Sequence, residues 1–207
     1  MAMSEAQQVW EEHYNERGQI WSGRVNVRLA EVAEPMTPGT ALDLGCGEGG
    51  DAAWLAERGW HVTAVEIAQT ALDRASALAN SRNIADRIVF QRRDMMESFP
   101  DGVFDLVSAQ FLHSKLPMDR ARLLRSAAGA VAPGGTLLIV DHAAPPPGMS
   151  KLDHHHEFPG TDEVLASLNL DAAQWDRVRV ESVDRDATDR DGQHFVWTDN
   201  VMVLRRR

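Results

Sequence analysis

Short apolar runs and longer helical patterns alternate along the chain between Thr40 and Val140, and this alternation limits the possible folds more than any other feature. Short runs rich in Val, Ile, Leu and Phe are typical of buried strands, whereas the segments between them carry apolar residues at helical spacing. Strand–helix–strand units of this kind assemble into a parallel sheet. The expected strands are 41–44, 61–65, 88–90, 104–108 and 136–140, and the expected helices are 51–58, 70–80 and 118–131.

The chain after residue 147 has a different pattern. We expect a helix over residues 161–168, followed by two runs of alternating polarity at 175–183 and 195–204. Residues 184–192 between these runs are charged and rich in turn formers, which predicts an antiparallel hairpin. The predicted fold class is therefore α/β: a Rossmann-like, doubly wound sheet of seven strands, mostly parallel, with the C-terminal hairpin as an antiparallel edge.

The length of 207 residues predicts a single domain, because domains cluster at roughly 100–200 residues. Within it we expect a helix and a lead-in or lid at 1–38, a ligand-binding core at 39–142, and a substrate loop with the hairpin at 143–207. The sequence leaves the oligomeric state open.

The net charge of −10 argues against nucleic acid or an anionic membrane as a partner, because both are bound through cations that neutralise phosphates. The chain contains one cysteine, Cys46, and its first residues lack the pattern of a signal peptide. We therefore expect a cytoplasmic protein. No run approaches the roughly 20 apolar residues that a membrane helix needs.

Residues 42–50, Leu-Asp-Leu-Gly-Cys-Gly-Glu-Gly-Gly, join the first expected strand to the first helix. Gly45, Gly47 and Gly50 match the pattern G-x-G-x-x-G. Glu66 ends the second expected strand about 20 residues later, where dinucleotide-binding proteins place an acid against ribose. An NAD-linked oxidoreductase is therefore one possible interpretation of the loop.

Acidic side chains around this loop favour a different ligand. Asp43 precedes the first glycine, Glu48 lies within the loop, and Asp51 lies at the start of the helix. These carboxylates would repel a pyrophosphate and attract a cation. S-Adenosylmethionine is such a ligand, since it carries a sulfonium and an ammonium against one carboxylate and has no phosphate.

Residues 42–49 resemble motif I of the class I S-adenosylmethionine-dependent methyltransferases. Further matching segments follow in the family's order over about residues 40–141: Val65-Glu66, Arg93-Asp94-Met95, Phe104-Asp105-Leu106-Val107 and Pro133-Gly134-Gly135-Thr136-Leu137. Residues 20–24, Ile-Trp-Ser-Gly-Arg, resemble the lead-in of the tellurite-resistance and thiopurine-type small-molecule methyltransferases. Val25 and Ala68 stand where those relatives commonly have Pro and Ser.

This resemblance implies a cofactor site. Asp43 would bind the methionine ammonium, Glu66 would accept both ribose hydroxyls, and Gly45 and Gly47 would let the backbone approach the ligand closely. The other cofactor-binding residues that it implies are Ile67, Asp94 and Met95 at the adenine, Gln110 near the sulfonium, Cys46 as a backbone contact in the loop, Arg24 at the methionine carboxylate and Trp21 over the cofactor.

Two histidines are the candidate catalytic residues. Methyl transfer is an in-line displacement that depends on alignment, and a general base is needed only for an acceptor that arrives protonated. His113 and His142 follow the fourth and fifth expected strands, at the carboxyl edge where open α/β sheets bind ligands. We interpret them as a general base or as contacts to the acceptor.

The run Asp153-His154-His155-His156-Glu157 contains side chains that transition metals prefer. Adjacent histidines point in different directions in a helix or a strand, so we expect this run to flank the acceptor pocket rather than to bind metal.

The sequence therefore predicts an enzyme that transfers a methyl group from S-adenosylmethionine to a small molecule and releases S-adenosylhomocysteine. The accepting atom is a thiol, another soft nucleophile, a hydroxyl or a heterocyclic nitrogen. An NAD-linked oxidoreductase and a non-catalytic S-adenosylmethionine-binding module remain alternatives.

Overall fold

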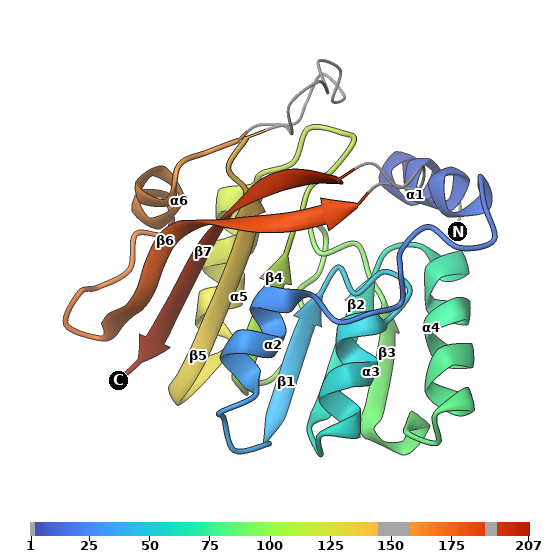
Figure 1. Ribbon diagram of the computed structural model, residues 1–207, viewed down its shortest axis with the longest axis horizontal. Helices are drawn as coiled ribbons and strands as arrows, with labels where there is room; N and C mark the ends of the chain where they lie inside the picture. The colour runs from blue at the N-terminus through green and yellow to red at the C-terminus, as the bar shows by residue number, and fades with distance from the viewer. Residues whose placement is uncertain (1–2, 145–157, 189–193) are drawn as a thin grey trace.

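Seven strands form one sheet in the order β3-β2-β1-β4-β5-β7-β6 (Figure 1). The computed structural model describes residues 3–144, 158–188 and 194–207. Its first five strands are β1 (Thr40–Leu44), β2 (His61–Glu66), β3 (Ile88–Arg92), β4 (Phe104–Gln110) and β5 (Val131–His142). Neighbours among these five pair in parallel, so their carboxyl ends meet at one edge of the sheet.

The last two strands form the predicted antiparallel edge. β7 (His194–Arg206) pairs antiparallel with β5, and β6 (Trp175–Thr188) pairs antiparallel with β7. The hairpin extends past the end of β5 toward the N-terminal helix (Figure 1). The predicted fold class, a mostly parallel sheet with an antiparallel C-terminal hairpin, is confirmed.

Helices cover both faces of the sheet. The helices are α1 (Glu5–Asn15), α2 (Val27–Ala33), α3 (Gly50–Glu57), α4 (Gln69–Ser81), the 3-10 turn η1 (Ala85–Arg87), α5 (Arg120–Gly129) and α6 (Thr161–Leu168). In β5, Leu138 and Val140 pack with α2, α3 and α4, whereas Leu137 and Ile139 pack with α5 and α6. The strand is therefore apolar on both faces, as expected for a strand covered by helices on each side.

Helix α1 is anchored at the carboxyl edge of the sheet, above α4 (Figure 1). The Glu11 carboxylate accepts hydrogen bonds from the backbone N–H groups of Gln69 (2.5 Å) and Thr70 (3.1 Å), which begin α4. A carboxylate at a helix N-terminus satisfies otherwise unpaired donors and stabilises the helix dipole. Burial raises the pKa of Glu11, but these hydrogen bonds and Arg92 outweigh it and leave the pKa lowered.

The hairpin is longer than the sequence predicts. Residues 184–188, expected to form a turn, continue β6, and Arg185 pairs in register with Trp197. Their polar side chains are satisfied across the hairpin: Asp184 accepts from the Thr198 hydroxyl (2.8 Å), and Arg185 donates to Asp199. These partners allow charged residues to remain in a strand.

Three further features differ from the expectations. Helix α5 ends at Gly129 rather than at Val131, because Val131 begins β5 opposite Phe104. The turn at Pro133 to Gly135 is an irregularity within the strand, after which pairing resumes at Thr136. The lead-in contains a second helix, α2, which packs its apolar residues against the core and which the sequence does not predict.

Within the described parts of the chain, none of the helices has the length and apolar character needed to cross a membrane.

Candidate cofactor and acceptor site

The glycine loop connects β1 to α3 at the carboxyl edge of the sheet. The N–H groups of Gly45 and Cys46 both donate to the carbonyl of Val65 at 2.9 Å, which holds the loop against β2. Gly47 has a φ of +54°, and a Cβ there would lie 3.1 Å from the Tyr14 hydroxyl and 3.2 Å from the Trp21 indole nitrogen. The loop therefore needs glycine at Gly47 for its backbone conformation and for the close approach of the lead-in.

Cys46 is a buried loop residue. Burial raises the pKa of its thiol well above the ordinary range, and the nearby carboxylates of Asp43 and Glu66 raise it further. Reactive cysteines are thiolates in electropositive surroundings, so these acidic surroundings do not favour Cys46 as a nucleophile.

Glu48 anchors the lead-in to the glycine loop. Its carboxylate accepts the backbone N–H groups of Trp21 (2.8 Å) and Ile20 (3.1 Å), and it pairs with the guanidinium of Arg74 at 2.7 Å. Arg74 also donates to the carbonyls of Tyr14 and Arg17. The negative charge of Glu48 is therefore balanced within the protein.

Asp51 forms the second anchor. It is buried at the start of α3, and its two oxygens accept the backbone N–H of Asn26 (2.7 Å) and its side-chain amide (2.8 Å). Two of the acids that the sequence suggests for a cationic ligand thus hold the lead-in instead. Their partners lie more than twenty residues away along the chain, beyond the reach of local sequence patterns.

Asp43 remains without such a partner. It is 3% exposed on β1, and its Oδ2 atom accepts no hydrogen bond from any residue that the structure describes. Burial raises the pKa of this carboxyl well above its ordinary value, and the neighbouring Asp51 and Glu66 raise it further. A buried acceptor left unpaired costs about 1–3 kcal/mol, and a cationic N–H donor would remove that cost.

Glu66 ends β2 and is held rigidly. Its carboxylate accepts the backbone N–H groups of Gly47 (3.1 Å), Ile67 (2.7 Å) and Ala68 (3.0 Å). A carboxylate offers roughly four acceptor positions, so about one remains, on the oxygen that faces Gly47. Burial raises the pKa of Glu66, opposed by these three donors.

Gln110 ends β4 beside the end of β1. Its amide nitrogen donates to the Ser108 hydroxyl at 3.3 Å, and its buried Oε1 accepts no hydrogen bond from the described residues. Asp43 and Ser108 are register partners, so Asp43 and Gln110 place two unpaired acceptors on adjacent strands. This pair suits a ligand that brings donors or positive charge.

The residues expected at the adenine follow β2 and β3. Asp94 accepts the backbone N–H of Met96 at 2.9 Å and contacts the Ser4 hydroxyl at 3.5 Å. Met95 is half-buried on the face that α5 covers, and Ile67 is half-buried beside Glu66. The structure brings them to the same edge of the sheet as the glycine loop.

Trp21 and Arg24 lie in the lead-in above the loop. The Trp21 side chain is 53% exposed, and its indole N–H donates to the Tyr14 hydroxyl at 3.3 Å. The backbone of Arg24 packs on the start of α3, where a Cβ at Gly50 would lie 2.9 Å from its carbonyl oxygen. The Arg24 side chain is exposed.

The two candidate histidines lie close together at the ends of β4 and β5. The ring of His142 is stacked between Phe111 and Trp197, with centroid distances of 4.3 Å and 3.8 Å. The His113 ring centroid lies 6.4 Å from that of His142. Phe111 has a φ of +49°, an uncommon value for an aromatic residue, immediately after Gln110.

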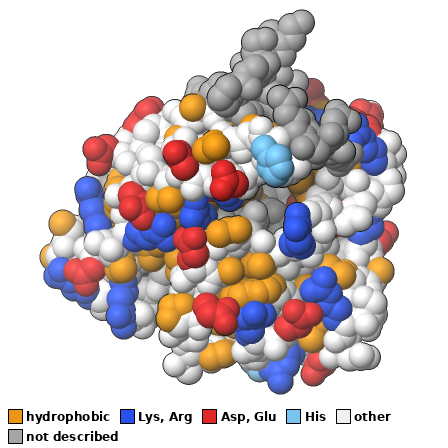
Figure 2. Space-filling view, viewed as in Figure 1, with side chains coloured by type: hydrophobic (Ala, Val, Ile, Leu, Met, Phe, Trp, Pro, Cys, Tyr) orange, Lys and Arg blue, Asp and Glu red, His pale blue; other side chains and the backbone are white. Residues whose placement is uncertain are grey.

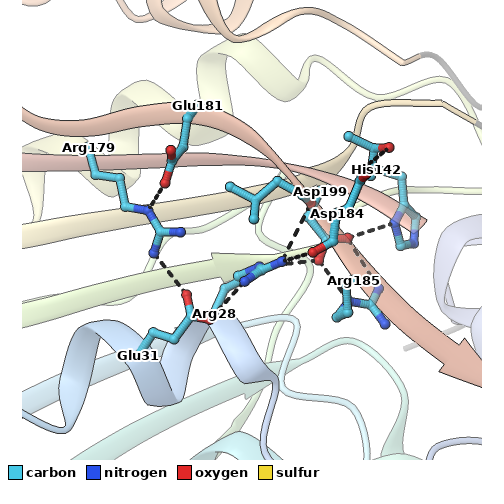
Figure 3. A network of polar contacts seen from close by, with 10 residues as sticks. Arg28, Glu31, His142, Arg179, Glu181, Asp184, Arg185 and Asp199 are labelled. Carbon is cyan, nitrogen blue, oxygen red and sulfur yellow. Dashed lines mark hydrogen bonds and ion pairs between the residues drawn. The ribbon is translucent and has the colours of Figure 1, made fainter. Parts of the chain in front are cut away.

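Asp199 lies directly across the β5–β7 pair from His142 and is fully buried. One oxygen is 3.5 Å from His142 Nδ1, and Arg185 donates to the two oxygens at 2.7 Å and 3.1 Å (Figure 3). Arg28 approaches from α2 at 3.5 Å and also pairs with Glu31 at 2.7 Å. Burial raises the pKa of Asp199, but the hydrogen bonds from His142 and Arg185 outweigh it and lower the pKa below its usual value.

Sequence analysis missed Asp199 and its arginines. The available signal was a charged residue in a predicted strand, just before the apolar residues 201–204, because buried charges are rare unless they are paired. That Asp199 lies opposite His142 is evident only from the strand register.

No cluster of three or more potential metal ligands occurs among the described residues. The run Asp153 to Glu157 lies outside them.

Residues 42–139 match the family model described as a methyltransferase domain. The chain is 32% identical over 154 residues to the 27-O-demethylrifamycin SV methyltransferase of Amycolatopsis mediterranei, which covers 73% of this chain and 56% of that protein. It is 33% identical over 105 residues to a probable tocopherol O-methyltransferase of Oryza sativa; this alignment covers 50% of this chain and 29% of that protein. The chain thus spans about half, or less, of the length of these two relatives.

Solved structures share the fold. A structure described under the conversion of a disulfide bond into a thioacetal group during echinomycin biosynthesis has a TM-score of 0.72 at 21% identity, over 97% of this chain and 91% of that one. TehB from Haemophilus influenzae has a TM-score of 0.71 at 17% identity, over 95% and 67%. Magnesium protoporphyrin IX methyltransferase from Synechocystis, solved with S-adenosylhomocysteine, has a TM-score of 0.67 at 15% identity, over 98% and 100%.

The strand order, the glycine loop with its buried acids and these sequence relatives lead to one conclusion: the chain belongs to the class I S-adenosylmethionine-dependent methyltransferases.

Proposed function

We propose that this protein transfers a methyl group from S-adenosylmethionine to a small-molecule acceptor. The observation that carries this proposal is the unpaired, buried oxygen of Asp43 at the carboxyl end of β1, with a second unpaired acceptor on Gln110. A cationic cofactor satisfies both, whereas a pyrophosphate would meet carboxylate oxygens. Relatives named for methylation of a rifamycin and a tocopherol support an acceptor of small size.

The cofactor residues take roles that follow from their contacts. Asp43 binds the ammonium. Glu66 has one acceptor position left and binds one ribose hydroxyl with it, rather than the two hydroxyls that the family resemblance implies. Gly45, Cys46 and Gly47 present backbone to the ligand. Ile67, Asp94 and Met95 border the adenine, Gln110 faces the sulfonium, Arg24 pairs with the methionine carboxylate, and Trp21 covers the site.

S-Adenosylmethionine supplies an electrophilic methyl carbon attached to a positively charged sulfur. The chain contributes alignment, for which a rigid site is needed. Rigidity comes from the two anchors of the lead-in on Glu48 and Asp51, and from the three backbone donors on Glu66. Trp21 and Tyr14 lie over Gly47, where a Cβ would come within 3.1 Å of the Tyr14 hydroxyl and 3.2 Å of the Trp21 indole nitrogen.

His142 is the general base for an acceptor that arrives protonated. The Asp199 carboxylate lies 3.5 Å from Nδ1 and its negative charge favours a proton on that nitrogen, which leaves Nε2, on the opposite side of the ring, to take the proton of the acceptor. The stacked rings of Phe111 and Trp197 hold the imidazole in place. His113 is the second candidate, close enough to contact the same acceptor.

Calorimetry with S-adenosylhomocysteine and with NADH tests the cofactor. We expect S-adenosylhomocysteine to bind and NADH not to bind; the reverse result would refute the proposal and support an oxidoreductase. Turnover is then measured by mass spectrometry as S-adenosylhomocysteine release over thiol, phenol, halide and heterocyclic amine acceptors. Binding without turnover on any of these classes would instead support a non-catalytic module.

A further inference from the structure

A cleft of about 800 Å³ lies between the lead-in and the C-terminal hairpin, a size in the range of small-molecule pockets. Residues 22–28 form one wall, and residues 185–188 with His194 form the other. Trp54 and Phe111 line it as well. Figure 2 shows the surface hollowed below the hairpin, on the face that carries α2 and α3.

This cleft reaches the proposed reaction site. Phe111 lines it, directly follows Gln110 at the end of β4, and stacks on His142. Arg24 lines it where the lead-in packs on the start of α3. A molecule in the cleft therefore lies between the proposed cofactor residues and the His142–Asp199 pair, which is where an acceptor must bind.

Arginines outnumber carboxylates in the lining of the cleft, although the chain as a whole carries a net charge of −10. Its lining contains four arginines, Arg24, Arg28, Arg82 and Arg185, against two carboxylates, Asp186 and Asp199. Asp199 is fully buried, and its negative charge is balanced by Arg185 at 2.7 Å and Arg28 at 3.5 Å. Arg82 is paired with Glu57 at 3.1 Å, and Arg28 is 6% exposed and bonded to Glu31.

Arg185 differs from Arg28 and Arg82. Its Nε and Nη2 atoms donate to Asp199, whereas Nη1 makes no hydrogen bond to any described residue. The side chain is 24% exposed, and its guanidinium carbon lies 5.8 Å from the centre of the Phe111 ring. Asp199 thus holds one edge of the guanidinium and leaves the other available to the cleft. Such a pre-oriented planar fork matches a carboxylate.

We propose that the methyl acceptor is an aromatic carboxylate and that Arg185 binds its carboxylate group. The inference rests on the proposed function, because it places the acceptor of that reaction. The flat ring lies against Phe111 and Trp54, each of which has one ring face beside His142 or Arg58 and offers its remaining apolar surface to the cleft. A carboxylate fits better than a phosphate dianion, since the free edge of one guanidinium offers two parallel donors to two oxygens and its charge is shared with Asp199.

Titration of the protein saturated with S-adenosylhomocysteine tests this proposal. The probes are 2-naphthoate and 2-naphthamide, which share size and ring but differ in charge. We expect naphthoate to bind at least about tenfold more tightly, as for a charged hydrogen bond. Arg185→Gln should bring the two affinities within about twofold, and Arg185→Lys, which keeps a cation beside Asp199, should lose most of the preference because it lacks the fork.

Arg177→Gln is the matched control, since Arg177 is an exposed arginine on β6 that does not line the cleft; it should keep the full preference. Equal affinity of the two probes in the unaltered protein would overturn the proposal without any variant. A preference that survives both Arg185 variants would also overturn it, because the anion would then bind elsewhere.

Failure of the proposed function is distinguishable. It appears as a lack of S-adenosylhomocysteine binding by the unaltered protein, and the naphthoate titration is then carried out without that ligand. Circular dichroism of each variant checks that it is folded before its titration is read.

Discussion

Asp43→Asn should make the cofactor-free protein more stable while weakening its cofactor site. The Asp43 carboxylate is 3% exposed, one of its oxygens is unpaired, and Asp51 and Glu66 are its neighbours. An amide of the same shape removes the charge and its repulsion. The amide still leaves buried polar atoms unpaired, so only the loss of the charge stabilises the protein. Because a charged unsatisfied group costs more than a neutral one, the free energy of unfolding should rise by about 1 kcal/mol at neutral pH.

The sign of the pH dependence follows from the direction of the pKa shift. The pKa of Asp43 is raised in the folded state, so the folded protein holds this proton more tightly than the unfolded chain does. The stabilising effect of that proton is complete below the unfolded pKa and is lost as the pH rises toward the folded pKa. The difference in stability between Asp43→Asn and the unaltered protein should therefore disappear at low pH, near or below the ordinary pKa of aspartate.

Urea unfolding of the cofactor-free proteins, followed by circular dichroism across this pH range, measures the effect on stability. Calorimetry with S-adenosylhomocysteine measures the cost to binding, which we expect to be about tenfold or more, the value of a charged hydrogen bond. Without ligand, the urea midpoint of the variant should therefore be higher than that of the unaltered protein. Added S-adenosylhomocysteine should raise the midpoint of the variant by less.

Asp51→Asn is the matched control from the same acidic cluster. It also removes one charge whose pKa burial raises, but it gives up a hydrogen bond to Asn26, so its free energy of unfolding should rise by less than that of Asp43→Asn. If Asp43→Asn lowers the stability of the cofactor-free protein at neutral pH, or binds S-adenosylhomocysteine as tightly as the unaltered protein, then Asp43 is not the unpaired ligand-binding acid.

Three further predictions concern the loop and the base. Glu66→Ala should weaken S-adenosylhomocysteine binding about tenfold or more, measured by calorimetry; unchanged affinity would place the ribose elsewhere. Gly47→Ala should lower the thermal midpoint, because its Cβ would meet Tyr14 and Trp21 at a positive φ; an unchanged midpoint would contradict that contact. His142→Gln should lower kcat on hydroxyl acceptors by about 10²–10⁴ and spare acceptors that arrive as thiolates; equal losses on both would argue against a base.

Much of the fold could be predicted because it depends on local patterns. Apolar runs bounded by glycine and turn residues identify β1 to β5, and their alternation with helical segments identifies a parallel sheet. The extent of the hairpin could not be predicted, because Asp184 and Arg185 remain in a strand only through partners on β7. Helix α2 was missed because its short apolar face becomes recognisable only where it packs on the core.

The candidate cofactor residues divide in the same way. Asp43, Gly45, Gly47 and Glu66 lie where a strand meets a loop, so their gathering at one edge follows from strand order. Their roles toward the cofactor stay predictions. The acids Glu48 and Asp51 cannot be told apart from Asp43 by sequence, because what separates them is whether a lead-in more than twenty residues away supplies hydrogen-bond donors.

By itself, the sequence determined the family, the order of the secondary structure and the position of the glycine loop, since each depends on residues close together in the chain. The tertiary structure decided which buried acid stays unpaired, and it placed Asp199 between His142 and Arg185. The physical reason is that burial and hydrogen-bond partners decide whether a carboxylate anchors the fold or is left to bind a ligand, and both are set by segments that meet only after folding.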